Sequence, residues 1–282
     1  MKAYLLDYLQ QAFREKFALP AFSIDNLSTV KSVVRGAELC RAPVILMVSE
    51  SSFTFLGLEY IKSMVETVTS KATVPVFLHF DHGQVIKHAE MMVDAGADSV
   101  MIDWSLKPID ENITGTQKIL DYAHHWGIAV EAEIGHVGGE EDGLKTNQVP
   151  ISDMSVVSRF YKSCPVDLLA IAAGSVHGHY KTPPHLHFDL IKKVSEHLKV
   201  PLVLHGGSGI PVEQVKQAIK CGICKVNIGT ELKEANVKAI RQYLIDHPDS
   251  FDMRTAETLG QKAMLDVVVA KIKMCGADGH VR

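Results

Sequence analysis

The feature that most constrains this sequence is a regular alternation of short apolar runs and helical patterns along its 282 residues. Most of the runs are apolar without interruption, as expected for parallel strands that are buried on both faces. The eight runs that we interpret as strands cover residues 18–24, 43–48, 75–81, 99–104, 129–134, 168–173, 201–205 and 224–228. Eight strands alternating strictly with eight helices within this length predict an α/β fold, a (β/α)8 TIM barrel.

Boundary signals mark several of the helices. Asn26 or Ser28 is suited to cap a helix that continues to Arg41. Pro211 is suited to the first turn of a helix that ends near Gly222. These signals fall between the predicted strands, so local and long-range patterns agree.

Two further helices extend the barrel pattern at its ends. Residues 1–17 have an amphipathic pattern with interspersed charges, which indicates a surface helix rather than a signal peptide. Residues 254–273 indicate an additional C-terminal helix that packs on the barrel or on a neighbouring subunit. A doubly wound sheet is the alternative fold, but no glycine-rich dinucleotide fingerprint follows the first strand. Since no linker divides the chain, we expect residues 1–282 to form a single barrel domain.

Composition narrows the classes of partner and compartment. The formal net charge is -4 and no block of lysine and arginine occurs, so neither a nucleic-acid nor a membrane-surface partner is predicted. No uncharged apolar run is long enough to span a bilayer. The five cysteines are odd in number and lack the spacing of a disulfide framework, which favours a reducing, cytoplasmic location.

Polar side chains of metal-ligand type close several of the predicted strands. His82, His177 and His205 each follow an apolar run, Asp103 ends another, and Glu133 lies in a fifth. In a barrel, functional residues lie at the carboxyl ends of the strands, so these side chains are expected to converge. Three neutral imidazoles with an open position are typical of a catalytic divalent metal such as zinc.

Two small-residue loops follow the last two predicted strands. Barrels often bind phosphate at this position with backbone N–H groups, small hydroxyls and a helix N-terminus. We expect a further close backbone contact from Gly178, which follows His177 directly. The loop residues are Gly206, Gly207 and Ser208 after the seventh strand, and Asn227, Ile228, Gly229 and Thr230 at the end of the eighth.

Carboxylates beside the predicted metal site suggest proton transfer. Asp81 directly precedes His82, and a strand end can turn both side chains into the barrel mouth. General acid/base work is favoured for Asp81, and orientation of an imidazole is the alternative. Residues 135–143 contain four glycines and three successive acids, which suits either a mobile lid or a solvated acidic turn.

A series of short motifs runs nearly end to end along the chain: LPAFSIDN, HFDHG, SVMID, EAEIG followed by GGEEDG, GSVHG, VLHGGSG and KVNIGTEL. In order and number they resemble the class II, metal-dependent ketose-bisphosphate aldolases. The later motifs are most similar to tagatose-bisphosphate aldolase catalytic subunits. Two places depart from the pattern: Ser23 stands where many relatives have Asn, and residues 105–108 follow an unusual Trp104.

The resemblance implies roles for individual residues. It implies that His82, His177 and His205 are ligands of one catalytic Zn²⁺ per subunit, and that Asp81 transfers a proton. It matches Glu141 to a mobile-loop acid that handles the proton on the ketose side. Asp103 and Glu133 match carboxylates that hold an alternative metal position or support the ligands from behind. The phosphate cradle for the triose is matched by Gly178, Gly206, Gly207, Ser208, Asn227, Ile228, Gly229 and Thr230.

The implied reaction is reversible cleavage of tagatose or fructose 1,6-bisphosphate to dihydroxyacetone phosphate and glyceraldehyde 3-phosphate. The resemblance also implies a homodimer or homotetramer, with an accessory subunit and a monovalent cation left open. Alternatives are an aldolase for a phosphorylated deoxy-keto acid and a non-catalytic assembly subunit of the same fold. A lysine Schiff-base aldolase would use Lys225, which we expect at a strand start, away from the barrel mouth.

Overall fold

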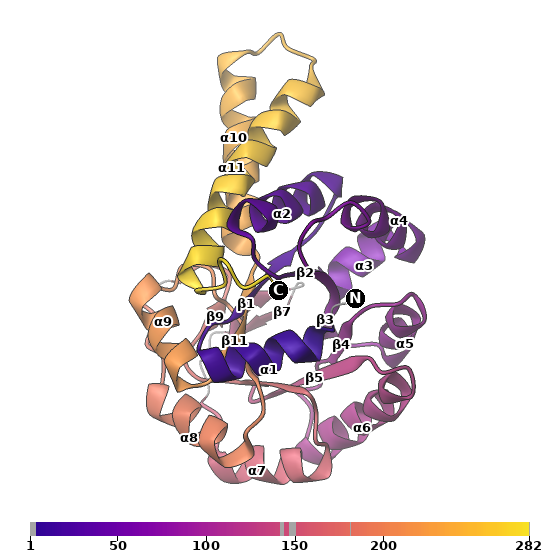
Figure 1. Ribbon diagram of the computed structural model, residues 1–282, viewed down its shortest axis with the longest axis vertical. Helices are drawn as coiled ribbons and strands as arrows, with labels where there is room; N and C mark the ends of the chain where they lie inside the picture. The colour runs from indigo at the N-terminus through magenta and orange to yellow at the C-terminus, as the bar shows by residue number, and fades with distance from the viewer. Residues whose placement is uncertain (1–3, 142–143, 147–150, 181, 282) are drawn as a thin grey trace.

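The computed structural model describes residues 4–141, 144–146, 151–180 and 182–281. Eight parallel strands close into a barrel in the order β1-β11-β10-β8-β5-β4-β3-β2, with helices around it (Figure 1). The predicted (β/α)8 barrel is therefore confirmed, and every predicted strand is present to within two residues at either end. The strands are β1 (Leu19–Ser23), β2 (Val44–Ser49), β3 (Val76–Gly83), β4 (Ser99–Ile102), β5 (Ala129–Ile134), β8 (Leu168–Ile171), β10 (Leu202–Leu204) and β11 (Ile223–Ile228).

The helices depart from strict alternation at one connection. Two helices, rather than one, link β2 to β3, because Gly57 with φ of 79° ends the first and begins the second. Left-handed backbone of this kind favours glycine. The helices that follow the barrel strands are α2 (Leu27–Cys40), α3 (Glu50–Leu56), α4 (Leu58–Thr69), α5 (Ile86–Asp94), α6 (Ile109–His125), α7 (Met154–Ser163), α8 (Phe188–Leu198), α9 (Val212–Cys221), α10 (Thr230–Asp246) and α11 (Met253–Met274).

N-cap residues mark where two of these helices begin. Asn26, not Ser28, caps α2: its side chain accepts a hydrogen bond from Thr29 N, and the Thr29 hydroxyl accepts one from Asn26 N. This reciprocal arrangement satisfies two backbone donors that a helix start leaves unpaired. Pro211 precedes α9 as its N-cap, one position before the predicted first turn.

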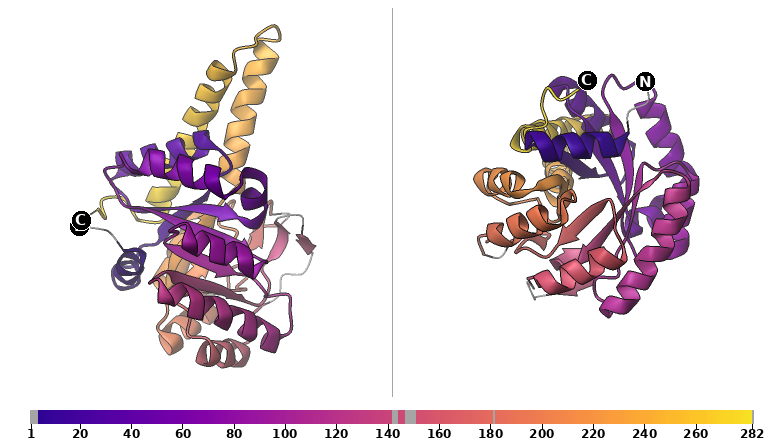
Figure 2. Two further views of the ribbon diagram at one scale, coloured as in Figure 1. Left: turned by 90° about the vertical axis from the view of Figure 1, so that its right-hand side faces the viewer. Right: turned by 60° about the horizontal axis from the view of Figure 1, so that its bottom comes forward.

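The two terminal helices lie at different places on the barrel. The predicted N-terminal helix is α1 (Leu5–Glu15), which buries Leu5, Tyr8 and Leu9 and contacts β1 and β11. The predicted C-terminal helix is α11, which packs against α10 and α2. Together α10 and α11 form a hairpin that projects well beyond the barrel (Figures 1 and 2). No helix in the described part of the chain is long and apolar enough to cross a membrane.

A second, small sheet was not predicted from the sequence. It contains β6 (Gly138–Glu141), β7 (Leu144–Thr146) and β9 (Val176–His177), in the order β7-β6-β9. In the left view of Figure 2, the β6–β7 hairpin (pink) lies on the opposite side of the barrel from α1 (indigo). The small sheet therefore lies at the end of the barrel where the strands terminate and where His177 is located.

Candidate active site

The end of β3 brings two successive side chains into the barrel mouth. His82 has a φ of 49°, which is uncommon for a residue with a side chain, and the pairing of β3 with β4 shifts register between Phe80 and Gly83. This irregularity breaks the usual alternation of faces. As a result, Asp81 and His82 are both buried, with 2% and 6% of their surfaces exposed. Left-handed backbone at a non-glycine residue is strained, and such strain is common at functional sites.

The three predicted histidines converge. Ring centroids lie 5.0 Å apart for His82 and His177, 4.5 Å for His82 and His205, and 5.7 Å for His177 and His205. Glu133 on β5 joins them, and one ligand atom from each of the four buried residues lies within 4.8 Å of the others. The strand ends predicted to meet therefore do meet.

The hydrogen-bonding pattern around these rings fits a divalent metal ion. Nδ1 of His82 lies 2.7 Å from a carboxylate oxygen of Asp103, and Nε2 of His205 lies 3.2 Å from one of Glu131. The opposite nitrogens, Nε2 of His82 and Nδ1 of His205, are 3.0 Å apart. With protons held toward the carboxylates, the lone pairs of these two nitrogens point into one space, where a cation can accept both; Nδ1 of His205 also lies 3.0 Å from the Asn227 amide nitrogen. Carboxylates behind imidazoles in this way are typical of metal ligands.

Electrostatics keeps the groups in the forms that such a site requires. Burial lowers the pKa of His205, and the nearby His82 lowers it further, so the imidazole is neutral. Burial alone would raise the pKa of Asp103, but its hydrogen bonds with His82 and Ser105 hold it below the ordinary value. The neutral ring and the ionised carboxylate are the states found in metal centres.

Asp81 lies beside the histidines, with its Oδ2 4.0 Å from Nε2 of His82. Its Oδ1 accepts a hydrogen bond of 3.1 Å from the Asn227 side chain and lies 3.3 Å from Nε2 of His79. Burial opposes ionisation of this carboxyl, but the neighbouring His82, His79 and Lys225 hold its pKa well below the usual range. Asp81 is therefore a carboxylate at neutral pH, which is the form that a proton acceptor needs.

Glu131 and Lys225 form a buried ion pair next to the site. Sequence reasoning missed Glu131 and expected Lys225 to lie away from the site. Lys225 lies near the start of β11, as predicted, but its side chain is not remote from the site. It is fully buried within the barrel, 2.8 Å from Glu131 Oε2 and 3.9 Å from Asp81 Oδ1. Glu131 in turn reaches His205 and lies 3.6 Å from His79. His79 is also fully buried.

A signal for this network was present in the strand sequences. In an extended strand, residues two apart share a face. Glu131 and Glu133 are spaced in this way, and so are Lys225 and Asn227. Charged or amide side chains at alternate positions of an otherwise apolar strand indicate a polar layer inside the barrel.

The predicted phosphate loops lie beside each other. Gly207 N donates to Asn227 O over 2.9 Å, which joins the loop after β10 to the end of β11. Ser208 is only 4% exposed, and its hydroxyl accepts a hydrogen bond from Glu231 N in the first turn of α10. Thr230 is the first residue of α10, and Gly229 is its N-cap. The loops therefore converge on a helix N-terminus, as predicted. Among the other residues predicted to bind phosphate, Ile228 is buried, and Gly178 and Gly206 have φ of 78° and 64°.

The glycine-rich segment after β5 is paired rather than isolated. β6 lies parallel to β9, with Gly139 opposite His177. A side chain at Gly139 would clash with the backbone of His177, so glycine is required for this approach. Glu141 is the last residue of β6, and its side chain lies outside the described part of the structure. Whether the segment is a lid stays a prediction.

Comparison with known proteins decides the family. The family model described as fructose-bisphosphate aldolase class-II matches residues 3–280. The chain belongs to the class II fructose-bisphosphate aldolase family. It is accordingly a class II aldolase, a lyase that cleaves carbon–carbon bonds.

Curated relatives and a solved structure agree with this assignment. The chain is 38% identical to a fructose-bisphosphate aldolase of Geobacillus stearothermophilus, over 97% of this chain and 96% of that protein. It is 40% identical to a 6-phospho-5-dehydro-2-deoxy-D-gluconate aldolase of Halalkalibacterium halodurans, over 98% and 96%. The crystal structure of the YdjI aldolase from Escherichia coli K12 superposes with a TM-score of 0.89 at 32% identity, and each chain is covered completely.

Proposed function

We propose that this protein cleaves a ketose 1,6-bisphosphate, tagatose or fructose, reversibly to dihydroxyacetone phosphate and glyceraldehyde 3-phosphate, with Zn²⁺ as cofactor. The observation that carries the proposal is the convergence of His82, His177 and His205 beside the buried carboxylate of Asp81. A retro-aldol reaction needs an acceptor for a hydroxyl proton next to a site that stabilises negative charge on the ketone side.

The three histidines would hold the ion, and Asp103 and Glu131 would orient two of their rings from behind. When bound, a divalent ion polarises a ketone oxygen and stabilises the negative charge that develops there. Glu133 lies close enough to the same cluster to act as a further ligand or to support it.

Asp81 is the proposed proton acceptor for the C4 hydroxyl. Asn227 donates to its carboxylate and fixes its orientation. Loss of the C4 hydroxyl proton allows the C3–C4 bond to break and releases the aldehyde. Glu141, on the hairpin paired to the His177 strand, is the proposed donor that returns a proton to C3 of the enediolate.

The phosphate of the dihydroxyacetone half is assigned to the loops after β10 and β11. The N-terminus of α10 and the backbone N–H groups of Gly206, Ser208, Gly229 and Thr230 supply partial positive charge there, whereas Gly207 N is bonded to Asn227 O. The glycines with positive φ allow the backbone to approach a ligand closely.

A second substrate is favoured by the relative that is 40% identical and named for 6-phospho-5-dehydro-2-deoxy-D-gluconate. Its ketone at C5 and phosphate at C6 place the same three-carbon phosphorylated ketone on one side of the cleaved bond. The two candidates therefore use the same metal, proton acceptor and phosphate loops. They differ in the aldehyde half, which carries a phosphate in one case and a carboxylate in the other.

The test compares kcat/KM for tagatose 1,6-bisphosphate, fructose 1,6-bisphosphate and 6-phospho-5-dehydro-2-deoxygluconate, before and after chelation and with zinc added back. We expect a ketose bisphosphate to be the best substrate and zinc to restore the chelated enzyme. Preference for the deoxygluconate would establish the second candidate. Full activity after complete chelation, with substrate trapped on Lys225 by borohydride, would contradict the metal-based reaction.

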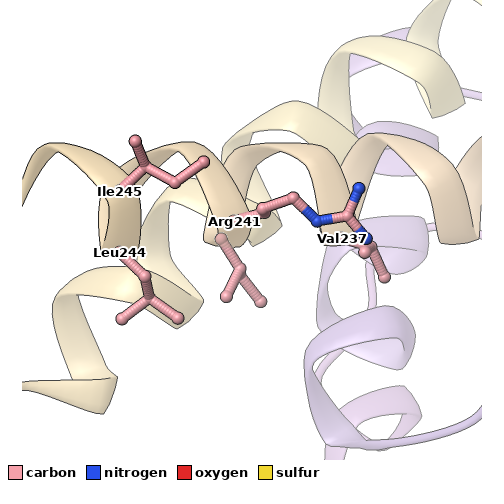
Figure 3. Close-up of a pocket in the computed structure, with 5 residues that line it drawn as sticks. Val237, Arg241, Leu244 and Ile245 are labelled. Carbon is pink, nitrogen blue, oxygen red and sulfur yellow. The ribbon is translucent and has the colours of Figure 1, made fainter. Parts of the chain in front are cut away.

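A homo-oligomer is proposed through the projecting α10–α11 hairpin. A groove on α10 is lined by Val237, Ile240, Arg241, Leu244 and Ile245 (Figure 3). Ile245 is 65% exposed although it is apolar, and adjacent exposed apolar side chains are typical of contact surfaces. We expect a second copy of the chain to cover this groove in a homodimer or homotetramer, and Leu244→Asp to shift the sedimenting species toward the monomer.

All five cysteines are free thiols, which supports a cytoplasmic location.

A further inference from the structure

Tyr180 bridges the two segments that carry His177 and His205. Its hydroxyl accepts a hydrogen bond from Val176 N over 3.1 Å and donates one to Gly206 O over 2.9 Å. Val176 immediately precedes His177, and Gly206 immediately follows His205. One oxygen atom therefore joins the backbone beside two of the three predicted metal ligands.

The surroundings of this hydroxyl leave little freedom between the segments. A Cβ atom at Gly206 would lie 2.2 Å from Val176 O, so the two backbones are in direct contact. The Tyr180 ring lies beneath the same loop, where a Cβ at Gly209 would be 3.2 Å from Cδ2. Burial raises the pKa of the Tyr180 hydroxyl to about 12, so it stays protonated and able to donate at neutral pH.

The other side of the loop is held independently of Tyr180. Gly207 N donates to Asn227 O, and Gly209 N donates to the Glu231 carboxylate over 2.8 Å. Glu231 is also ion-paired with Lys271 of α11. The loop after β10 is thus fixed to β11 and α10 on one side, and the Tyr180 hydroxyl fixes it to the His177 segment on the other.

We propose that Tyr180 is a positioning residue that sets the spacing between His177 and His205, and through it the affinity of the site for its metal ion. The inference rests on the proposed metal-dependent function. Without the hydroxyl, Val176 N and Gly206 O lose their common partner and the two segments can separate. Binding of the ion would then have to bring the two histidines into place, and the cost of this ordering would weaken the affinity.

The experiment measures zinc affinity of Tyr180→Phe by competition with a chromogenic chelator, in the absence of substrate. Phenylalanine keeps the ring and its contact with Gly209 and removes only the bridging oxygen. Loss of groups that support metal ligands weakens metal binding by about 10- to 100-fold, and we expect a change of this size. Tyr122→Phe is the matched control, because it removes one hydroxyl bonded to Asp94 on the outside of the barrel.

Thermal unfolding of the metal-free variants separates positioning from general stability. The proposal expects both variants to unfold close to the wild-type temperature, with only Tyr180→Phe impaired in zinc binding. The proposal would be overturned if the zinc affinity of Tyr180→Phe stayed within about twofold of wild type, because loss of a supporting group has a much larger effect. A Tyr180→Phe chain that does not fold would also overturn it, by showing a structural role alone. Absence of zinc binding by the wild-type protein would instead refute the proposed metal-dependent function, and this inference with it.

Discussion

Replacement of Lys225 by methionine tests the buried charge network that underlies the site. Methionine fills a similar volume but leaves the carboxylates of Glu131 and Asp81 without the ammonium that lies 2.8 Å and 3.9 Å away. Burial alone would raise the pKa of Glu131, but Lys225, followed by His79 and His205, lowers it to about 2 from 4.5. At about 1.36 kcal/mol per pKa unit, this difference corresponds to about 3 kcal/mol of stabilisation of the ionised carboxylate.

Lys225 is the largest of the favourable influences, so we expect the metal-free variant to lose about 3 kcal/mol of unfolding free energy at neutral pH. This agrees with the cost of about 3–5 kcal/mol for removing one partner of a buried ion pair. Urea denaturation in the presence of a chelator measures the change. Lys216→Met is the control, because its partner Glu213 is exposed and the pair should contribute less than about 1 kcal/mol.

The dependence on pH distinguishes charge from packing. A carboxyl with a lowered folded-state pKa stabilises the protein above its unfolded-state value, and this contribution is lost as pH falls toward the folded-state value. For Glu131 that window runs from 4.5 down to about 2. The deficit of Lys225→Met should therefore be full above this window and shrink within it. A deficit below about 1 kcal/mol at neutral pH, or one of equal size at all pH values, would refute the electrostatic reasoning.

Three further predictions concern the reaction. Asp81→Asn should keep zinc and lose about 10²- to 10⁴-fold in kcat, because the amide cannot accept the proton; a kcat near wild type would remove Asp81 from that role. Glu141→Gln should slow hydrogen–deuterium exchange at C3 of dihydroxyacetone phosphate with zinc content unchanged, and exchange at the normal rate would mean that another group returns the proton. Ser208→Ala and Thr230→Val should each worsen kcat/KM by roughly 10- to 100-fold for phosphorylated donors, since a hydrogen bond to a charged group contributes about 1.5–3 kcal/mol. Equal losses with unphosphorylated dihydroxyacetone would show that these hydroxyls do not serve the phosphate.

Much of the barrel could be predicted because parallel strands covered on both faces are apolar without interruption. The runs around Ile45, Leu169 and Val203 have this character, and each becomes a barrel strand. Helix ends follow from equally local chemistry, as Asn26 and Gly222 show. The histidines could be located at strand ends because their apolar runs stop there, and strand ends share one edge of a barrel.

The tertiary structure alone decided which of these groups touch. The inward turn of both Asp81 and His82 depends on a left-handed residue and a register shift, and neither has a signature in the sequence. Lys225 meets Glu131 across the barrel, 94 positions away in the chain, so only closure of the sheet brings them together. The two-residue strand β9 exists because β6 pairs with it, and so short a run has no periodicity of its own. Local patterns determine burial and element type, whereas contacts between distant strands depend on register and closure, which the chain specifies only as a whole.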